Sequence, residues 1–369
     1  MRVLEMDGGP EAVRSLTSAL AAALEGGPAV LPSSSGAITT AMAPERPVEP
    51  GTAVVIATSG STGEPKGVLL SAAALRASAE ATHARLGGPG RWLLATPAQY
   101  VGGLQVLVRS LVAGTEPEVL DLSKGFSPEA FAAAVRGMGE GPRYSALVPT
   151  QLTRLVEARV DLSGLDAIVL GGAALDPLLR ERAVRAGTRV ISAYGMSETA
   201  SGCVYDGVPL DGVRVRLGDG DRVEIAGPTL AHGYRLRPDL TAEAFAGGWF
   251  RTTDVGRLRD GRLEVLGRAD DVINTGGVKV APALVERALT GHPAVRAACV
   301  VGLPDAEWGQ RVEAVLVADD PLPVDELRAL VRQAAGAPAV PKRFLAVPAL
   351  PLRGPGKVDR SAVTALLTD

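Results

Sequence analysis

Short apolar runs alternate with helical stretches along most of this 369-residue chain, and this alternation is the strongest constraint on its fold. The apolar runs have the length and composition of buried strands and lie at residues 52–60, 91–98, 118–123, 144–150, 167–175 and 189–195. Helical stretches between most of these runs lie at residues 71–87, 127–138 and 176–187. Such alternation predicts an α/β fold of layered sheets and helices, in which much of the sheet is parallel. Residues 32–50 are rich in Pro, Ser and Thr and are predicted to form a loop.

The pattern changes twice in the second half of the chain. From about Val213 onward, short alternating runs joined by Asp-Gly turns predict β-hairpins. After Asp270 the order is helix, strand, strand, helix, which predicts a small α+β unit of roughly 100 residues, a normal size for a separate domain. We therefore predict an N-terminal domain over residues 1–268 and a C-terminal domain over residues 269–369.

Charge and cysteine content argue against several kinds of partner. A net charge of −3 gives no electrostatic reason to expect nucleic acid or an anionic membrane. Cys203 and Cys299 lie far apart and form neither a disulfide framework nor a zinc cluster. The first residues do not have the order of a signal peptide, and no apolar run is long enough to span a bilayer. We therefore expect a cytoplasmic protein without a nucleic-acid partner or a stable membrane association.

The segment ATSGSTGEPKGV, residues 57–68, concentrates hydroxyls and glycines around one lysine directly after an apolar run. A Walker loop has Ser or Thr after its lysine, whereas Gly67 follows Lys66, so the segment is not a Walker loop. It still suits a phosphate, because hydroxyls and backbone N–H groups can donate to it and the lysine is positive. The candidate residues are Thr58, Ser59, Gly60, Ser61, Thr62, Gly63 and Lys66. A flexible surface loop is the alternative interpretation.

Six segments resemble the signatures of one family, in that family's order. They are residues 57–68, 171–175, 193–201, 251–256, 266–282 and 351–360. On these segments the chain is identified as a member of the acyl-adenylate-forming (AMP-binding) superfamily, which includes acyl-CoA synthetases, peptide-synthetase adenylation domains and luciferases. The resemblance implies a large N-terminal domain of layered α/β sheets with a small β-subdomain, followed by a small, mobile α+β C-terminal domain. It also implies that ATP and a carboxylic acid react with Mg²⁺ present to give acyl-AMP, from which a thiol, usually that of coenzyme A, expels AMP.

The resemblance assigns roles to residues around the phosphates. Lys357 would bridge the acid and the α-phosphate, because the first half-reaction brings two anions together and needs cations and oriented donors. Glu198 would bind Mg²⁺, and Ser197, which stands where the family usually has Thr, would reach the α-phosphate. Without the resemblance, Lys357 is an exposed loop lysine and Glu198 is a carboxylate favoured by the dipole at a helix start.

The resemblance also assigns residues to the rest of the nucleotide, to the hinge and to the thiol channel. The adenine side is assigned to Gly171, Gly172, Ala173, Tyr194 and Gly195. Asp254 and Arg268 would bind the ribose hydroxyls, with a structural ion pair as the alternative. Asp270 would be the hinge about which the C-terminal domain swings. Gly276 and Gly277 would let the pantetheine arm of coenzyme A pass, although by sequence alone they indicate only a turn.

The choice of acid should depend on the segments between these motifs. Residues 96–114, 147–156 and 197–215 resemble one subgroup of this superfamily. It comprises the o-succinylbenzoate–CoA ligases of menaquinone biosynthesis, in their compact actinobacterial-like forms. Their substrate has one carboxyl that is activated and a second, on the ring, that needs a partner. Arg109 is the predicted partner, and Gln99 and Thr150 are weaker pocket candidates. Arg109 could instead snorkel or pair with an acidic side chain.

Three functional hypotheses stay open at the level of sequence. The leading one is an o-succinylbenzoate–CoA ligase, and the second is an acyl- or aryl-CoA ligase or a stand-alone adenylation enzyme for another acid. The third is a nucleotide-binding protein that has lost catalysis, against which Lys357, Glu198 and Asp254 argue together. The glycine-rich loop begins near residue 58, much earlier than in most members, so we expect a shortened N-terminal region. The oligomeric state is left open, with a homodimer among the expected forms.

Overall fold

The computed structural model describes residues 1–59, 65–318, 321–352 and 358–368. The chain divides into two compact units. Unit 1 comprises Met1–Leu175, Leu179–Arg216 and Glu224–Arg251, and unit 2 comprises Asp176–Leu178, Leu217–Val223 and Thr252–Asp369. The domain boundary between residues 268 and 269 remains a prediction.

The first sheet of unit 1 has the strand order β1-β2-β3-β4-β14. β1, β2 and β3 run parallel, whereas β4 and β14 are each antiparallel to their neighbours. The strands are β1 (Arg2–Glu5), β2 (Val30–Ser33), β3 (Val54–Ser59), β4 (Pro65–Leu70) and β14 (Gly233–Tyr234). The loop predicted over residues 32–50 is therefore partly wrong, because β2 ends at Ser33 and α2 (Gly36–Ala41) follows it. Only Val30 and Leu31 give β2 an apolar signal, which is too short to identify a strand.

The second sheet of unit 1 has the order β11-β10-β9-β8-β7-β5-β6. Its strands from β9 to β6 are parallel, and β10 and β11 extend it as an antiparallel edge. The strands are β5 (Arg91–Leu94), β6 (Glu118–Val119), β7 (Arg143–Leu147), β8 (Ala167–Leu170), β9 (Arg189–Met196), β10 (Ser201–Tyr205) and β11 (Val208–Pro209). The predicted parallel α/β arrangement is confirmed for this sheet.

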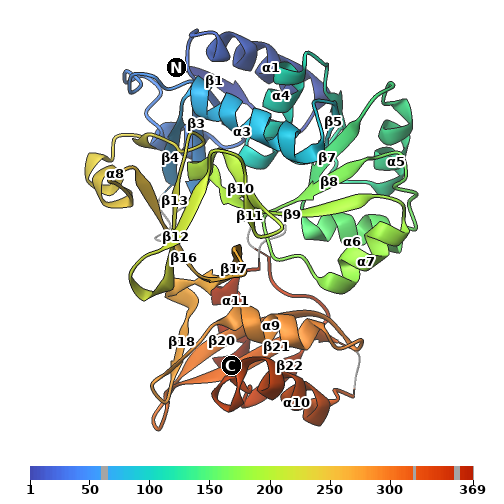
Figure 1. Cartoon of the computed structure of the whole chain (residues 1–369), viewed down its shortest axis with the longest axis vertical. Helices are drawn as coiled ribbons and strands as arrows, with labels where there is room; N and C mark the ends of the chain where they lie inside the picture. The colour runs from blue at the N-terminus through green and yellow to red at the C-terminus, as the bar shows by residue number, and fades with distance from the viewer. Residues whose placement is uncertain (60–64, 319–320, 353–357, 369) are drawn as a thin grey trace. The chain divides into compact units, whose positions relative to one another are not determined.

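Helices separate the two sheets of unit 1 and cover the outer face of the second. α1 contacts β1 and β2 on one side and α3 and α4 on the other, while α4 also contacts β5 and β7. α5, α6 and α7 lie together on the opposite face of the second sheet, where Phe131, Leu152 and Ile168 share one apolar cluster (Figure 1). The helices are α1 (Pro10–Leu24), α3 (Ala72–Leu86), α4 (Val101–Ala113), α5 (Pro128–Gly137), α6 (Pro149–Glu157) and α7 (Pro177–Arg185).

The β-hairpins predicted after Val213 are present. In the hairpin of β16 and β17, Asp260 (φ 51°) and Gly261 (φ 73°) form the two-residue turn, both in the left-handed region that such turns require. The elements of this part of the chain are β12 (Arg214–Leu217), β13 (Arg222–Ala226), α8 (Pro238–Ala244), β15 (Phe245–Ala246), β16 (Trp249–Arg259) and β17 (Arg262–Arg268).

The predicted order of helix, strand, strand, helix is confirmed for α9, β20, β21 and α10, but β18 and β19 come between Asp270 and α9, and β22 and α11 follow α10. The sheet has the order β19-β18-β21-β20, and β22 pairs in parallel with β21. Along β20, Val300 belongs to one apolar cluster while Cys299 and Val301 belong to another, as the period of two along a strand dictates. The elements are β18 (Ile273–Thr275), β19 (Val278–Val280), α9 (Pro282–Thr290), β20 (Val295–Asp305), β21 (Gly309–Ala318), α10 (Val324–Ala335), β22 (Arg343–Ala346) and α11 (Arg360–Thr368). Among the residues described, no helix is long and apolar enough to cross a membrane.

A buried arginine fixes the long connection between α2 and β3. Arg235, directly after β14, has a side chain that is 1% exposed and forms an ion pair with Glu49 at 2.9 Å. Its guanidinium also donates to the carbonyl oxygens of Met42, Ala43, Arg46 and Pro47. The second carboxylate oxygen of Glu49 accepts from Leu236 N at 2.8 Å. The side chain of Arg235 therefore satisfies the hydrogen-bonding carbonyl groups of a connection that has no regular secondary structure.

Replacing Arg235 should destabilise unit 1. Arg235→Met removes the partner of a half-buried carboxylate and the donors to four carbonyls, so we expect the free energy of unfolding to fall by about 3–5 kcal/mol. Urea denaturation followed by circular dichroism measures it. Arg14→Met, on the exposed side of α1, is the matched control and should change stability by less than about 0.5 kcal/mol. Equal effects of the two substitutions would show that Arg235 does not anchor this connection.

Candidate active site

The residues predicted to bind adenine and the acid gather at one edge of the second sheet. β5, β7, β8 and β9 are parallel and in register, so their carboxyl ends meet at that edge. The residues at or after these ends are Gln99 after β5, Thr150 after β7, Gly171, Gly172 and Ala173 after β8, and Tyr194 and Gly195 within the last residues of β9. In open α/β sheets this is the edge at which ligands bind.

A tight turn after β9 presents Ser197 and Glu198. Gly195 is required at its start, because a Cβ there would clash with the carbonyl oxygen of Ser201 on the neighbouring strand. Ala200 (φ 50°) and Ser201 (φ 89°) both adopt backbone conformations that L-amino acids rarely take. Backbone strain of this kind persists where the surrounding structure enforces it, commonly at functional sites. It fixes the segment that carries Glu198.

The strands β3 and β4 form the base of the glycine-rich segment. Thr58 and Lys66 are directly opposite each other, and Thr58 Oγ1 donates to the carbonyl oxygen of Lys66 at 3.3 Å. Ser59 pairs with Pro65 at the last described step of the hairpin. The other candidates of this segment, Gly60, Ser61, Thr62 and Gly63, lie outside the described residues.

Tyr234, which sequence analysis did not single out, links this hairpin to Glu198. Its hydroxyl donates to Glu198 Oε1 at 2.9 Å, and Lys66 Nζ lies 5.8 Å from the centroid of its ring. Burial, together with the negative charge of Glu198, raises the pKa of Tyr234, so the phenol keeps its proton and remains a donor. A Gly-Tyr pair in a polar stretch of sequence carries no signal for this role, and only the pairing of β14 with β4 reveals it.

The donor set around Glu198 fits Mg²⁺ rather than a metal held entirely by protein. Within the described ranges there is no group of three or more His, Cys, Asp or Glu side chains that could hold a metal ion. Mg²⁺ commonly binds one or two carboxylates and completes its shell with phosphate oxygens and water. Tyr234 donates a hydrogen bond to Glu198 and, as a neutral hydroxyl, brings no positive charge that would compete with a metal ion for the carboxylate. The residues present therefore fit a magnesium–nucleotide complex.

Arg109 on α4 is buried in the interior of unit 1, 1% exposed. Its guanidinium carbon lies 4.8 Å from the ring centroid of Trp92, whose Nε1 donates to His83 Nε2 at 3.2 Å. Nε and Nη2 of Arg109 have no hydrogen-bond partner among the described residues. Burial, and then the charge of Arg109, lower the pKa of His83 to about 4, so His83 is neutral. A buried guanidinium with free donors is costly and suits an anionic ligand.

The two weaker pocket candidates lie at the sheet edge, and neither has the burial of Arg109. Gln99 is half-buried and Thr150 is exposed. The neighbouring Gln151 serves the fold instead, since its Nε2 donates to the carbonyl oxygen of Ala95 at 2.6 Å and its Oε1 accepts from Val148 N at 3.1 Å. Its amide thereby ties the start of α6 to the end of β5.

Unit 2 contains the residues predicted for ribose and for the hinge. Asp254 and Arg268 are directly opposite each other on β16 and β17, and Arg268 Nη2 lies 3.2 Å from Asp270 Oδ2. The three predicted residues are therefore brought together. Gly276 (φ 58°) and Gly277 (φ 79°) form the two-residue turn between β18 and β19.

The segment that carries Lys357 is anchored at its C-terminal side. Lys357 itself lies outside the described residues. Three positions later, Arg360 donates to Glu286 Oε1 at 2.7 Å and to the carbonyl oxygen of Val300 at 2.6 Å, and its Nε lies 3.4 Å from Asp271 Oδ2. Arg360 therefore ties the start of α11 to the residue that follows the predicted hinge.

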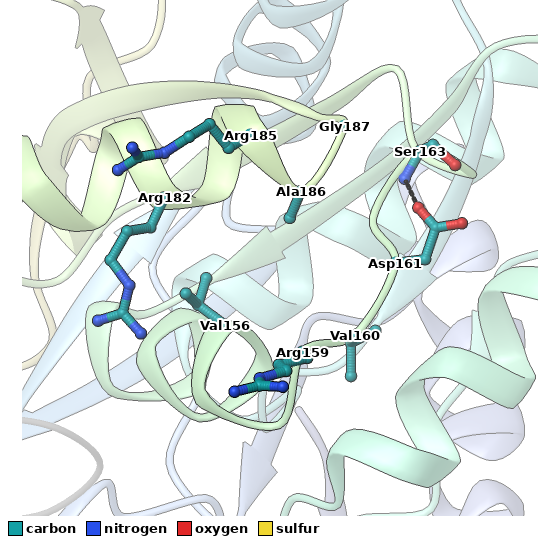
Figure 2. A pocket seen from close by; sticks show the side chains of 9 residues that line it. All are labelled: Val156, Arg159, Val160, Asp161, Ser163, Arg182, Arg185, Ala186 and Gly187. Atoms are coloured by element: carbon teal, nitrogen blue, oxygen red, sulfur yellow. Dashed lines mark hydrogen bonds between the residues drawn. The ribbon is translucent and has the colours of Figure 1, made fainter.

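A surface depression elsewhere in unit 1 is distinct from this site. Figure 2 shows Arg159, Arg182 and Arg185 around it, together with Ser163, whose backbone N–H donates to Asp161. Its lining residues lie at or after the C-terminal ends of α6 and α7 and come before β8 and β9, respectively, in the sequence. The depression therefore lies at the amino ends of these strands, at the opposite edge of the sheet from the predicted residues. Arginines at helix C-termini are favoured by the helix dipole. The helix dipole therefore accounts for the clustering of these arginines, without a bound ligand.

Comparison with protein families assigns most of the chain. Residues 6–234 match the AMP-binding enzyme family and residues 284–357 match the AMP-binding enzyme C-terminal domain. The chain belongs to the AMP-binding enzyme family. The membership predicted from the six sequence segments is therefore confirmed, as is the α/β fold class.

Among known proteins, this AMP-binding enzyme is 49% identical to the probable 2-succinylbenzoate–CoA ligase of Mycobacterium tuberculosis, over 84% of this chain and 83% of that one. The amide bond synthetase McbA of Marinactinospora thermotolerans has 32% identity and a TM-score of 0.77 over 86% of this chain and 70% of its own.

The o-succinylbenzoate coenzyme A synthetase (MenE) of Bacillus subtilis is similar in two complexes. With ATP and magnesium ion it has 28% identity and a TM-score of 0.74 over 85% of this chain and 70% of that one. With the acyl-adenylate intermediate OSB-AMP it has 26% identity and a TM-score of 0.76 over 95% and 80%.

The neutral state of His83 gives the stability of this AMP-binding enzyme a pH dependence. Between pH 6.5 and pH 4 the unfolded chain binds a proton at His83 that the folded chain does not, so stability is present above this window and falls as the pH is lowered through it. We expect a loss of about 3 kcal/mol from this group between pH 7 and pH 4. In His83→Gln this part of the dependence should disappear, as urea denaturation between pH 4 and pH 7 would show. Parallel pH profiles for the two proteins would contradict it.

Proposed function

We propose that this chain is an ATP-dependent 2-succinylbenzoate–CoA ligase that acts in menaquinone biosynthesis. The observation that carries the proposal is Arg109, a buried guanidinium with two nitrogen atoms that lack partners among the described residues. A substrate with a second carboxylate would supply the missing acceptor. The name and the high identity of the mycobacterial relative support the same reaction.

The two half-reactions place different demands on the protein. In the first, a carboxylate oxygen of the acid attacks the α-phosphorus of ATP and pyrophosphate leaves, giving acyl-AMP. In the second, the sulfur of coenzyme A attacks the acyl carbonyl, AMP leaves and the thiol proton is released. Lys66 and Lys357 would offset the negative charge in the first step, and Ser197 would donate to the α-phosphate. Mg²⁺, when held by Glu198, neutralises phosphate charge.

The remaining residue roles belong to this proposal. The adenine would lie beside residues 171–173 and Tyr194, and the ribose hydroxyls would bind Asp254 with help from Arg268. Asp270 would act as the hinge between domains divided at residues 268 and 269, and Gly276 and Gly277 would line the path of coenzyme A. The enzyme would work in the cytoplasm without nucleic acid or stable membrane association, with a homodimer as one expected form.

The position of Arg109 suits an extended dicarboxylate. Arg109 is eight residues along α4 from Val101, which places it about 12 Å down the helix from the end near the candidate active site. An acid that is activated at the sheet edge can reach this depth only with its far end. In 2-succinylbenzoate the succinyl carboxyl is activated and the ring carboxylate is at the other end. Gln99 and Thr150 would contact the portion between them.

A second candidate is activation of another carboxylic acid, by an acyl- or aryl-CoA ligase or a stand-alone adenylation enzyme. The likeness to the amide bond synthetase McbA favours it, since that protein shares the fold at 32% identity. The two candidates differ in the acid and, for a stand-alone adenylation enzyme, also in the group that accepts the acyl chain.

Pyrophosphate release with ATP and Mg²⁺ distinguishes these candidates. The acids would be 2-succinylbenzoate, benzoate, a medium-chain fatty acid and several amino acids, with coenzyme A added in a second series and thioesters detected by mass. We expect turnover with 2-succinylbenzoate alone, ending in its coenzyme A ester. Release with another acid instead would remove the menaquinone role, and silence with every acid would favour a protein that binds nucleotide without catalysis.

Arg109→Met should separate recognition from stability. Loss of a carboxylate partner is expected to lower kcat/KM for 2-succinylbenzoate by about 100-fold or more, while KM for ATP stays unchanged. Because an unpaired buried charge is replaced by an apolar side chain, the free enzyme should be as stable as before or more so.

Arg154→Met is the matched control for this substitution. Arg154 also stacks on an aromatic ring, that of Phe126 at 5.6 Å, but it is exposed on α6. It should leave kcat/KM unchanged. Unchanged use of 2-succinylbenzoate by Arg109→Met, or a loss of stability in place of a loss of activity, would contradict carboxylate recognition by Arg109.

A further inference from the structure

Tyr234 lies between the two charged groups that the proposed function assigns to phosphate and to Mg²⁺. Its hydroxyl is 2.9 Å from Glu198 Oε1, and its ring has the ammonium of Lys66 5.8 Å from its centroid. The side chain is buried, with 7% of its surface exposed. Lys66 and Glu198 are 132 positions apart in sequence, and this one side chain contacts both.

The backbone of Tyr234 is held from two sides. On one side β14 pairs with β4, where Tyr234 is opposite Val68. On the other, Ala231, three residues before Tyr234, donates its N–H to the carbonyl oxygen of Glu198 at 2.8 Å. The segment 231–234 therefore bridges the strand that leaves the glycine-rich segment and the turn that presents Glu198.

Further contacts fix both the backbone and the ring of Tyr234. The backbone N–H of Tyr234 donates to Thr241 Oγ1 at 2.9 Å, and the ring of Tyr234 contacts that of Phe245 edge-on, with 5.7 Å between the ring centroids. A Cβ on Gly233 would come within 2.7 Å of Thr241, so only glycine lets this segment approach so closely. The hydroxyl thus has a fixed place from which to orient Glu198.

We propose that Tyr234 is a positioning residue for the magnesium–phosphate part of the site. Its hydroxyl sets the orientation of the Glu198 carboxylate, and its ring face holds the ammonium of Lys66 nearby through a cation–π contact. The proposal rests on the proposed function, because that function gives Glu198 and Lys66 their ligands. Tyr234 itself touches neither the acid nor the reacting atoms in this scheme.

Tyr234→Phe tests the proposal, because it keeps the ring and removes only the hydroxyl. Pyrophosphate release with 2-succinylbenzoate, measured over a range of Mg²⁺ concentrations, should need about 5–10-fold more Mg²⁺ for half-maximal rate. KM for 2-succinylbenzoate should not change. Tyr144→Phe is the matched control, since it also removes the hydroxyl of a tyrosine in unit 1, one that donates to the carbonyl oxygen of Gly88 at 3.3 Å.

A binding measurement tests Tyr234 independently of turnover. Mn²⁺ binding, followed by electron paramagnetic resonance with a non-hydrolysable ATP analogue present, should weaken about 5–10-fold in Tyr234→Phe and stay unchanged in Tyr144→Phe. If the wild-type enzyme activates none of the acids, the proposed function fails while this titration still decides the role of Tyr234. Equal Mn²⁺ affinity in all three proteins would overturn the proposal, even where Tyr234→Phe is less active.

Discussion

The parallel pairing of β5, β7, β8 and β9 is the constraint on which the rest of unit 1 depends. Parallel neighbours need a crossover connection, and here helices supply it on both faces of the sheet. The strands are therefore buried on both sides, and their carboxyl ends deliver four separate segments to one edge. If two neighbouring strands paired one register out of step, the segments that follow them would shift relative to each other. The residues of the candidate active site on those segments would shift as well.

The order of elements was largely predictable because the signals for strands and crossover helices are local. Apolar runs and the helices between them indicated the second sheet, and Asp-Gly turns indicated the later hairpins. The strands β2, β4 and β14 were not predicted, because each is short or borders the glycine-rich segment and depends on pairing with distant strands. Such pairing is a tertiary effect that propensity in a short window does not carry.

The candidate site divides in the same way. Glu198, Lys66 and Asp254 stand in recognisable segments, so their identity could be predicted from sequence without knowledge of their neighbours. Tyr234 and Arg235 could not, because their roles come from contacts with residues 36 and 186 positions away in sequence. Two adjacent residues of one short segment thus support different parts of unit 1, one through Glu198 and the other through residues 42–49.

Arg109 shows that a buried charge in a site of this kind lowers the stability of the free protein. The interior of unit 1 holds its guanidinium on Trp92, which His83 in turn fixes by accepting the indole N–H. Both partners are neutral, so they orient the charge without neutralising it. A carboxylate side chain in place of His83 would stabilise the free protein, yet it would also occupy the donors that a second substrate carboxylate needs. Under the proposed function, stability is given up at this position so that the substrate, and no side chain, would complete the ion pair.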